Sequence, residues 1–135
     1  MNLADRARRF FSVSLAGAAL LLPLLPGSAN AAAEESGRLF LTIAGGHSTW
    51  VRGVQLACPA RVDSHHPHAD AACQQLVPAH GEPGAVVGEK HPCTREYDPV
   101  SATAEGEWNG RPLVWHKTYP NACALDSAAG PLFRF

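Results

Sequence analysis

Residues 100–119 have the sequence VSATAEGEWNGRPLVWHKTY and carry the clearest structural signal in the chain. Two runs rich in β-branched and aromatic residues flank Asn109-Gly110, and an Asn-Gly pair in this setting is the strongest short-range signal for a β-hairpin with a two-residue turn. Because such a turn fixes the register, Val100 should lie opposite Tyr119. The sequence therefore predicts an antiparallel hairpin over residues 100–119.

The predicted register gives the hairpin two different faces. On one face small residues stand opposite large ones, as in the pair Ala104 and Trp115. The other face is polar and carries Ser101, Thr103, Glu105 and Glu107. We expect Trp108 and Trp115 to anchor the core and the glutamates to face water.

Three further strands are expected outside this hairpin. Runs of β-branched, aromatic or alternating apolar residues at 39–43, 51–57 and 132–135 each indicate a short strand. Together with the hairpin they predict a five-stranded antiparallel sheet.

Two short helices are expected beside the sheet. Pro67 suits an early helical position, and apolar residues recur at helical spacing from Ala69 to Val77 before Pro78 ends the pattern. Residues 124–129 indicate one or two further helical turns. The expected fold class is therefore α+β, with a five-stranded antiparallel sheet and one or two short helices.

The four cysteines lie at Cys58, Cys73, Cys93 and Cys123. An even number in a small exported domain predicts two disulfides, and none of the four has the C-x-x-C spacing of a zinc site. Four cysteines allow three connectivities. Extending the hairpin register beyond Tyr119 brings Cys123 close to Cys93, which favours the bridges Cys93–Cys123 and Cys58–Cys73.

The first 31 residues have the pattern of a secretion signal peptide. A basic region precedes an apolar run at 10–25, and Ala29-Asn30-Ala31 forms a small-x-small cleavage site. Pro23 interrupts the apolar run, so a permanent membrane span is not expected. Residues 1–31 are predicted to be removed, which makes the mature protein secreted and extracellular.

Cleavage after Ala31 leaves residues 32–135, a length of 104 residues that corresponds to one domain. Removing three arginines and one aspartate leaves 8 Lys and Arg against 11 Asp and Glu, a formal charge of −3. This charge provides no basic surface for nucleic acid, so no nucleic-acid partner is expected.

The segment CTREYDPV, residues 93–100, places Arg95 between a cysteine two residues before it and a proline four residues after it. A trypsin-like protease recognises a cationic side chain through a carboxylate in its specificity pocket. A loop that is already stiff in the bound geometry loses less entropy on docking. Most surface arginines are simply solvated, so the segment indicates a protease-binding loop only together with the rest of the chain.

No catalytic motif is present in the sequence. It lacks the G-x-S-x-G elbow, the H-E-x-x-H helix and a phosphate-binding glycine loop. The cluster His65-His66-Pro67-His68 is interpreted as a solvated helix entry, because Pro67 breaks helical pairing and no acidic or cysteine ligand lies nearby. We expect no enzyme activity, no metal and no cofactor.

Four features together resemble the Streptomyces subtilisin inhibitor family. They are the cysteine separations of 15 and 30 residues, the segment CTREYDPV at 93–100 and the terminal GPLFRF at 130–135. The resemblance extends from Leu39 to Phe135 and includes H-P followed by A-A-C at 66–73 and W-N-G-R-P at 108–112.

The resemblance implies a secreted serine protease inhibitor that acts by the substrate-like standard mechanism, with Arg95-Glu96 as the reactive bond. The founding type has a large apolar residue at the position of Arg95, so arginine should direct this chain toward trypsin-like enzymes while subtilisin-like enzymes remain targets. The resemblance also implies that Asn121 supports the loop from behind and that the protein forms a homodimer through the outer face of its sheet. The protease-binding loop would contain Pro92, Cys93, Thr94, Tyr97 and Asp98.

Two other classes of protein compete with this interpretation. A secreted, disulfide-stabilised binding module without inhibitory activity would keep the same scaffold, although the intact Arg95 between Thr94 and Glu96 argues against it. A small secreted hydrolase would need Ser, His and Asp to converge from loops, and nothing in their order or spacing supports that. Titration of the mature domain against trypsin and subtilisin separates these classes.

Overall fold

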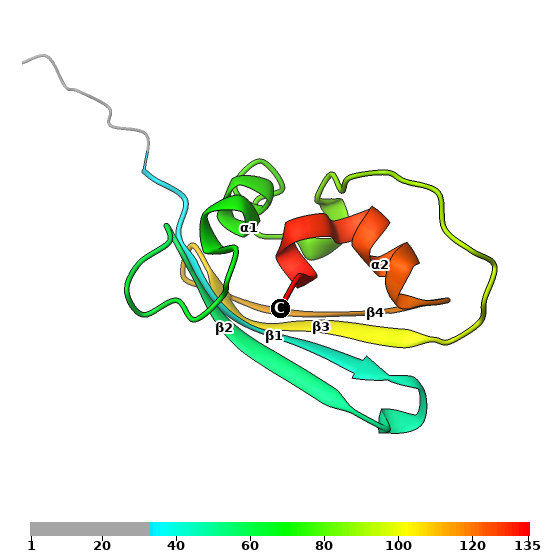
Figure 1. Ribbon diagram of the computed structural model, residues 1–135. Coiled ribbons are helices and arrows are strands. Elements are labelled where there is room, and N and C mark those ends of the chain that lie inside the picture. Colours follow the sequence, from blue (N-terminus) through cyan, green and yellow to red (C-terminus); the bar gives the residue numbers. More distant parts are fainter. Residues whose placement is uncertain (1–32) are drawn as a thin grey trace, which may run out of the picture. The chain divides into compact units, whose positions relative to one another are not determined.

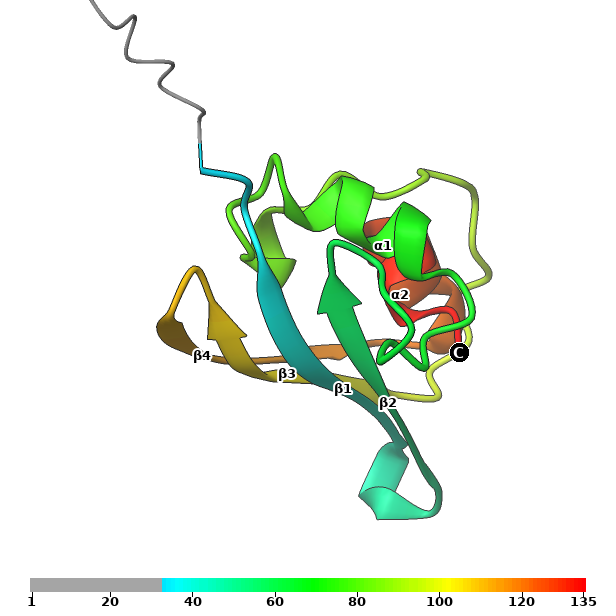
Figure 2. The same cartoon turned by 90° about the vertical axis from the view of Figure 1, so that its left-hand side faces the viewer.

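A four-stranded antiparallel sheet forms one layer of the fold, and two helices lie over one of its faces (Figure 1). The computed structural model describes residues 33–135, and the predicted signal peptide at 1–31 lies outside the described residues. The strands are β1 (Gly37–Gly45), β2 (Val51–Cys58), β3 (Val100–Trp108) and β4 (Arg111–Tyr119), in the order β2-β1-β3-β4. The helices are α1 (Ala69–Leu76) and α2 (Ala122–Ala129), and Figure 2 shows both on the same side of the twisted sheet.

The β3–β4 hairpin has the register that the sequence predicts. Val100 pairs with Tyr119 and Ala104 pairs with Trp115. The turn residues Asn109 and Gly110 have φ angles of 50° and 73°, which is the backbone that a two-residue hairpin turn requires and that Asn and Gly tolerate. The local turn chemistry therefore places every residue of both strands on its predicted face.

The core lies between the inner face of the sheet and the two helices. Alternate residues of β1 point inward, and the small side chains of Ala102 and Ala104 on β3 leave room for the helical layer. Trp108 is 4% exposed, and Trp115 stacks on Phe133 at the edge of the core. The most completely buried large side chains are Leu39, Leu41, Leu56, Leu76, Leu132 and Pro83.

The predicted fifth strand at 132–135 is wrong, because residues Gly130–Phe133 form a 3-10 helix. Gly130 has a φ of 47° and ends α2, and Pro131 has no N–H to donate to a sheet. Leu132 and Phe133 are both buried, whereas neighbouring residues of a strand point to opposite faces. The sheet therefore has four strands, and the C-terminal segment packs as part of the helical layer.

The entry to α1 also differs from the expectation. The helix begins at Ala69, two residues after Pro67, and ends at Leu76. The neighbouring His66 is not solvated: it is 5% exposed, and its Nε2 lies 3.0 Å from the carbonyl oxygen of Leu132. His66 therefore belongs to the packing between the α1 entry and the C-terminal segment.

Both predicted disulfides are present. Cys58 at the end of β2 bonds to Cys73 on α1, and Cys93 bonds to Cys123 on α2. The first bridge fastens α1 to the sheet, and the second fastens an irregular connection to α2. Within residues 33–135, no helix is both long and apolar enough to cross a membrane.

Candidate functional site: a protruding loop supported by α2

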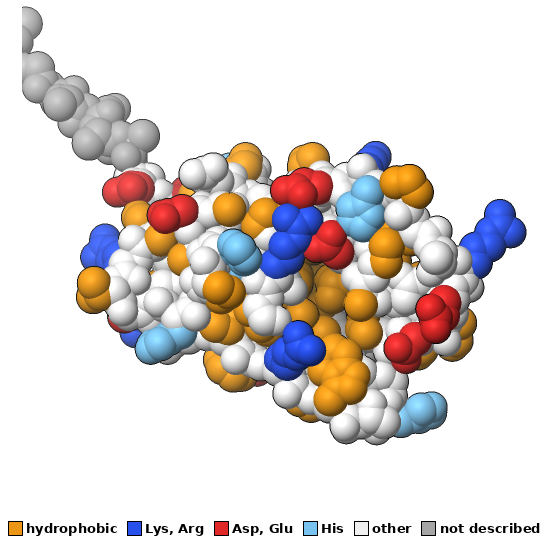
Figure 3. All heavy atoms as spheres, viewed as in Figure 1, with side chains coloured by type: hydrophobic (Ala, Val, Ile, Leu, Met, Phe, Trp, Pro, Cys, Tyr) orange, Lys and Arg blue, Asp and Glu red, His pale blue; other side chains and the backbone are white. Residues whose placement is uncertain are grey.

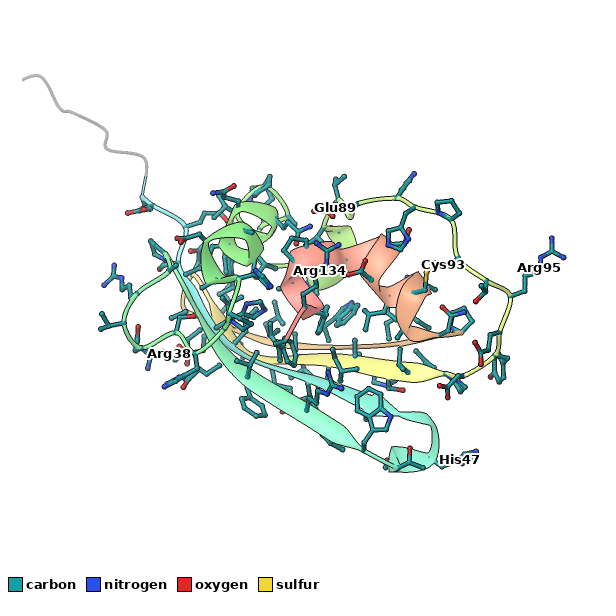
Figure 4. All side chains as sticks on the ribbon, viewed as in Figure 1. Arg38, His47, Glu89, Cys93, Arg95 and Arg134 are labelled. Carbon is teal, nitrogen blue, oxygen red and sulfur yellow. A yellow bond between two sulfur atoms is a disulfide. The ribbon has the colours of Figure 1, made fainter. Side chains whose placement is uncertain are left out.

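A long irregular segment, residues 86–99, connects a 3-10 turn at Pro83–Ala85 to β3 and curves around one end of the molecule (Figure 1). The residues from Pro92 to Asp98 are exposed, and the side chain of His91 is 35% exposed. Arg95 lies at the outermost part of this segment and points away from the protein (Figure 4). The segment thus presents its central residues to a partner rather than enclosing a cavity.

Asn121 holds this exposed segment from below. Its Nδ2 donates to the carbonyl oxygens of Thr94 at 3.3 Å and Glu96 at 2.8 Å, the residues on either side of Arg95. Its Oδ1 accepts a hydrogen bond from the backbone N–H of Ala124 at 2.8 Å and so caps α2. A single buried amide therefore joins the start of α2 to the backbone around Arg95.

The two arms of the segment are fixed on either side of this contact. On the amino side, the disulfide joins Cys93 to Cys123 in the first turn of α2. On the carboxyl side, the N–H of Asp98 donates to the carbonyl oxygen of Pro120 at 3.0 Å. Residues 94–97 are consequently held at both ends and in the middle, which restricts their backbone while leaving the side chains free.

A group of polar side chains fastens the approach to the loop. The Oγ of Ser127 accepts from the N–H of His91 at 3.2 Å, and the imidazole Nε2 of His91 lies 2.8 Å from Asp126 Oδ2. Asp126 also accepts from Arg134, whose other contact is Glu89 at 2.9 Å. The hydrogen bond with Asp126 raises the pKa of His91, and the hydrogen bond with Arg134 lowers the pKa of Asp126.

The charges near the tip are of mixed sign. Arg95 is the only lysine or arginine between His91 and Asp98, and Glu96 and Asp98 follow it. In Figure 3 acidic side chains lie beside the basic side chain that protrudes at the right-hand end. A partner that binds this tip must accept one cation and tolerate nearby anions.

His91, Asp126 and Ser127 lie close together but do not have the geometry of a hydrolase. The Ser127 hydroxyl bonds to the backbone N–H and carbonyl of His91 and does not pair with its ring. The remaining ring nitrogen, Nδ1, faces the carbonyl of Pro92 and the disulfide. These three residues therefore lack the bond between nucleophile and base that acyl transfer requires.

The same histidine lies near two sulfur atoms without forming a metal site. Its Nδ1 is 3.8 Å from Cys93 Sγ and 3.7 Å from Cys123 Sγ. Metal coordination uses the thiolate form of cysteine, and here both sulfurs are joined in a disulfide. The imidazole packs against the bridge instead.

The structure brings nearly all of the sequence-selected residues to this one end of the molecule. The loop residues, Asn121 and the second disulfide lie together, and the first disulfide lies apart, between β2 and α1. The residues that the sequence analysis missed are Ser127, Asp126 and Arg134. They are separated from His91 by 36, 35 and 43 positions, and no periodic pattern in the sequence connects them.

The fold and the loop define the protein as a small disulfide-bonded domain that presents a fixed, exposed peptide segment. Residues 35–121 match the family described as subtilisin inhibitor-like. The chain belongs to this family.

Two curated relatives from Streptomyces match most of the chain. A subtilase-type protease inhibitor of Streptomyces coelicolor is 38% identical over 126 residues, which cover 90% of this chain and 85% of that protein. Subtilisin inhibitor-like protein 3 of the same organism is 39% identical over 102 residues, which cover 72% and 95%. These relatives are protease inhibitors and not enzymes, in agreement with the expectation that this chain is not an enzyme.

A solved structure shows the same fold in a relative. Sermetstatin of Streptomyces caespitosus, crystallised in complex with Bacillus licheniformis subtilisin, superimposes with a TM-score of 0.57. It is 29% identical in sequence, and the match covers 75% of this chain and 99% of that chain.

Proposed function

We propose that this protein is a secreted serine protease inhibitor whose reactive bond is Arg95-Glu96 and whose main targets are trypsin-like enzymes. The observation that carries the proposal is the placement of Arg95. It is exposed at the outermost part of the loop, and the carbonyl oxygens of its two neighbours, Thr94 and Glu96, are both held by Asn121. The cationic side chain is thus offered on a backbone that is already ordered, which lowers the entropic cost of docking.

Binding would follow the pattern of a substrate. Residues 92–98 would lie in the protease cleft as an added strand, with Arg95 paired to the carboxylate of the specificity pocket. Cleavage of Arg95-Glu96 would leave two new ends that remain attached to α2. The disulfide to Cys123 and the hydrogen bonds of Asn121 would hold these ends in contact, so that resynthesis of the bond competes with release of the product.

Subtilisin-like enzymes are a second proposed target. The relative sermetstatin was solved in complex with subtilisin. An enzyme with a permissive pocket would bind the extended backbone of residues 92–98 whether position 95 is basic or apolar. Arg95 therefore adds trypsin-like targets without removing subtilisin-like ones.

The substitution Arg95→Met tests the assignment of the reactive bond. It leaves the pocket carboxylate of trypsin buried without a cationic partner, a cost of about 3–5 kcal/mol, or at least a hundredfold in affinity. Inhibition constants should rise by that factor for trypsin and stay unchanged or improve for subtilisin. The matched control is Arg111→Met, because Arg111 is also exposed but begins β4 at the hairpin turn.

If Arg95→Met inhibits trypsin as strongly as the unchanged protein, the reactive bond lies elsewhere. If the unchanged protein inhibits neither trypsin nor subtilisin, the protein is a binding module that has the inhibitor fold without the inhibitor activity.

We also propose that two subunits associate through the outer face of the sheet. Phe40 on β1 is 55% exposed and Val114 on β4 is 82% exposed, and both belong to this face. The helices cover only the opposite face, so the outer face is open for a second sheet. Because the loop lies at one end of the molecule, each subunit of such a dimer would keep its own reactive bond accessible.

A further inference from the structure

The loop has a leading arm, residues 87–93, that is attached to the helical layer by side chains along its whole length. At the start of the arm, Gln75 of α1 donates from Nε2 to the carbonyl oxygen of Val87 at 3.0 Å. Gly88 lies so close to the carbonyl of Ala128 on α2 that a Cβ at this position would clash with it. At the end of the arm is the disulfide of Cys93. The arm is therefore a packed part of the domain and not a free tether.

A chain of charged groups fills the middle of the arm. Glu89 contacts Arg134 Nη2 at 2.9 Å, and Arg134 contacts Asp126 through Nε at 2.5 Å and Nη2 at 3.1 Å. Asp126 Oδ2 then contacts His91 Nε2 at 2.8 Å. Figure 4 shows Arg134 and Glu89 directed toward each other above α2. Two residues of the arm are in this way joined to α2 and to the C-terminal segment.

His91 occupies the position from which this chain of contacts affects the reactive bond. It stands two residues before Cys93 and four before Arg95, and its ring packs against the Cys93–Cys123 bridge. Its backbone N–H is bonded to Ser127. A change in the attachment of His91 therefore reaches the anchored end of the loop directly.

We propose that His91, Asp126 and Arg134 are positioning residues that form an ionic clasp on the leading arm, and that the clasp tightens protease binding when His91 carries a positive charge. The proposal rests on the proposed inhibitory function. It assigns to these residues the task of keeping the amino-side end of the reactive bond in place. None of them touches the reactive bond itself.

The groups that contact His91 determine whether the clasp strengthens or weakens as the pH rises. Asp126 raises the pKa of His91 above its ordinary value of 6.5, so the charged imidazole contributes stability that is complete below 6.5 and is lost as the pH rises through the higher folded value. Asp126, whose pKa is lowered mainly by Arg134, stays ionised across this range. The clasp should therefore be strongest in mildly acidic solution.

The other charged groups around His91 keep the balance in favour of its protonation. Asp126 faces it from α2, and Arg134, which opposes a positive charge, faces it from the C-terminal segment. Within the arm, Glu89 neutralises Arg134, and Lys90 is exposed. The hydrogen bond with Asp126 is the dominant influence on the pKa of His91.

The test compares the unchanged protein with His91→Gln, which keeps a neutral hydrogen-bond donor at every pH. Affinity for a trypsin whose catalytic serine is replaced by alanine is measured at about pH 5.5 and about pH 9, and only the ratio between the two inhibitors is used. We expect His91→Gln to bind about two- to fivefold more weakly at the lower pH, the range of an exposed ion pair, and equally well at the higher pH. The matched control, His65→Gln, alters an exposed histidine on the β2–α1 connection and should show equal binding at both values.

A second measurement does not depend on inhibition. In the free protein, the protection factor of the His91 amide, which donates to Ser127, should fall when His91 loses its proton, after correction for the intrinsic pH dependence of exchange, and Asp126→Asn should abolish this fall. The clasp is overturned if the ratio of the two inhibitors' affinities is near one at both pH values. It is also overturned if the protection factor of the His91 amide does not change as His91 titrates. If the unchanged protein does not bind trypsin, the proposed function is refuted, and the exchange measurement alone then shows whether the clasp exists.

Discussion

The amide of Asn121 has two tasks that a single substitution can separate. In Asn121→Asp, the remaining oxygen still caps α2 at Ala124, but the side chain no longer donates to Thr94 and Glu96, and a carboxylate repels their carbonyl oxygens. We expect the fold to keep most of its stability. Trypsin should nevertheless cleave the loop of this variant and then dissociate from the cleaved protein. Incubation with catalytic amounts of trypsin, followed by mass spectrometry, measures the cleaved fraction over time.

The comparison variant is Asn121→Ala, which loses both tasks. It should be cleaved in the same way and should also lose about 1 kcal/mol of stability through the missing cap. If Asn121→Asp remained an intact and permanent inhibitor, the hydrogen bonds to the loop would not be what protects the reactive bond.

His66 should make the stability of the fold depend on pH in the direction opposite to His91. Burial lowers the pKa of His66, and in the neutral ring Nε2 donates to the carbonyl of Leu132 while Nδ1 accepts from the N–H of His68. The unfolded chain takes up a proton near pH 6.5 that the folded chain refuses, so stability falls as the pH drops below this value. Thermal unfolding at about pH 7 and pH 5 should show this decrease in the unchanged protein and a smaller one in His66→Gln, and an identical decrease in both would contradict it.

At the residue scale, the sequence reveals those site residues that lie in one short segment. Arg95, Glu96 and their neighbours are consecutive, and Asn121 was reached through the family resemblance. The clasp on the leading arm could not be found in this way, because His91 and Asp126 are surface residues whose contact depends on how α2 lies against the loop. Exposed polar residues have no periodicity that would reveal such a contact.

At the scale of elements, local turn chemistry decided which expectations were correct. The β3–β4 register was confirmed because Asn109-Gly110 fixes the pairing by itself. The expected strand at 132–135 was wrong because four residues are too few to define a period, and Gly130-Pro131 favours a tight turn. Short patterns beside strong breakers are thus poorly determined by sequence.

The two disulfides should have different effects when removed. Without Cys93–Cys123, as in the double alanine variant, the loop loses its covalent anchor, and the inhibitor should become a substrate of trypsin. Removal of either bridge should lower the free energy of unfolding by about 2–5 kcal/mol. Without Cys58–Cys73, however, inhibition should persist under conditions in which the variant is folded. Unfolding by urea and cleavage by trypsin, measured on both variants, separate stability from loop support.

If trypsin cleaved the two folded variants equally fast, the overall stability of the domain, and not the anchor of the loop, would control its resistance to cleavage. The loss of all inhibition in the Cys58–Cys73 variant, with folding demonstrated by near-ultraviolet circular dichroism, would lead to the same conclusion.

At the scale of the whole molecule, the dimer that we propose from the family resemblance can be tested on the outer face of the sheet. Val114→Lys places a charge in the middle of this face and should convert the dimer to single subunits in sedimentation experiments at micromolar concentration, because an unpaired buried charge is costly. Inhibition of trypsin per subunit should not change, because the loop lies away from this face. Val62→Lys is the control, since Val62 is fully exposed on the β2–α1 connection.

A single-subunit mass for the unchanged protein would contradict the dimer directly. A Val62→Lys variant that dissociates as readily as Val114→Lys would place the association on a different surface.

Nearly every group that holds the reactive loop comes from residues 120–134, which follow the loop in the chain. During synthesis, residues 92–98 therefore emerge before Asn121, Cys123 and Arg134 exist to hold them. Until those residues are in place, Arg95 lies on a flexible peptide that a trypsin-like enzyme would cut as a substrate. Under the proposed function, the chain can resist such an enzyme only after its last residues are in place, so the time needed to complete this end sets how long the new chain remains a substrate.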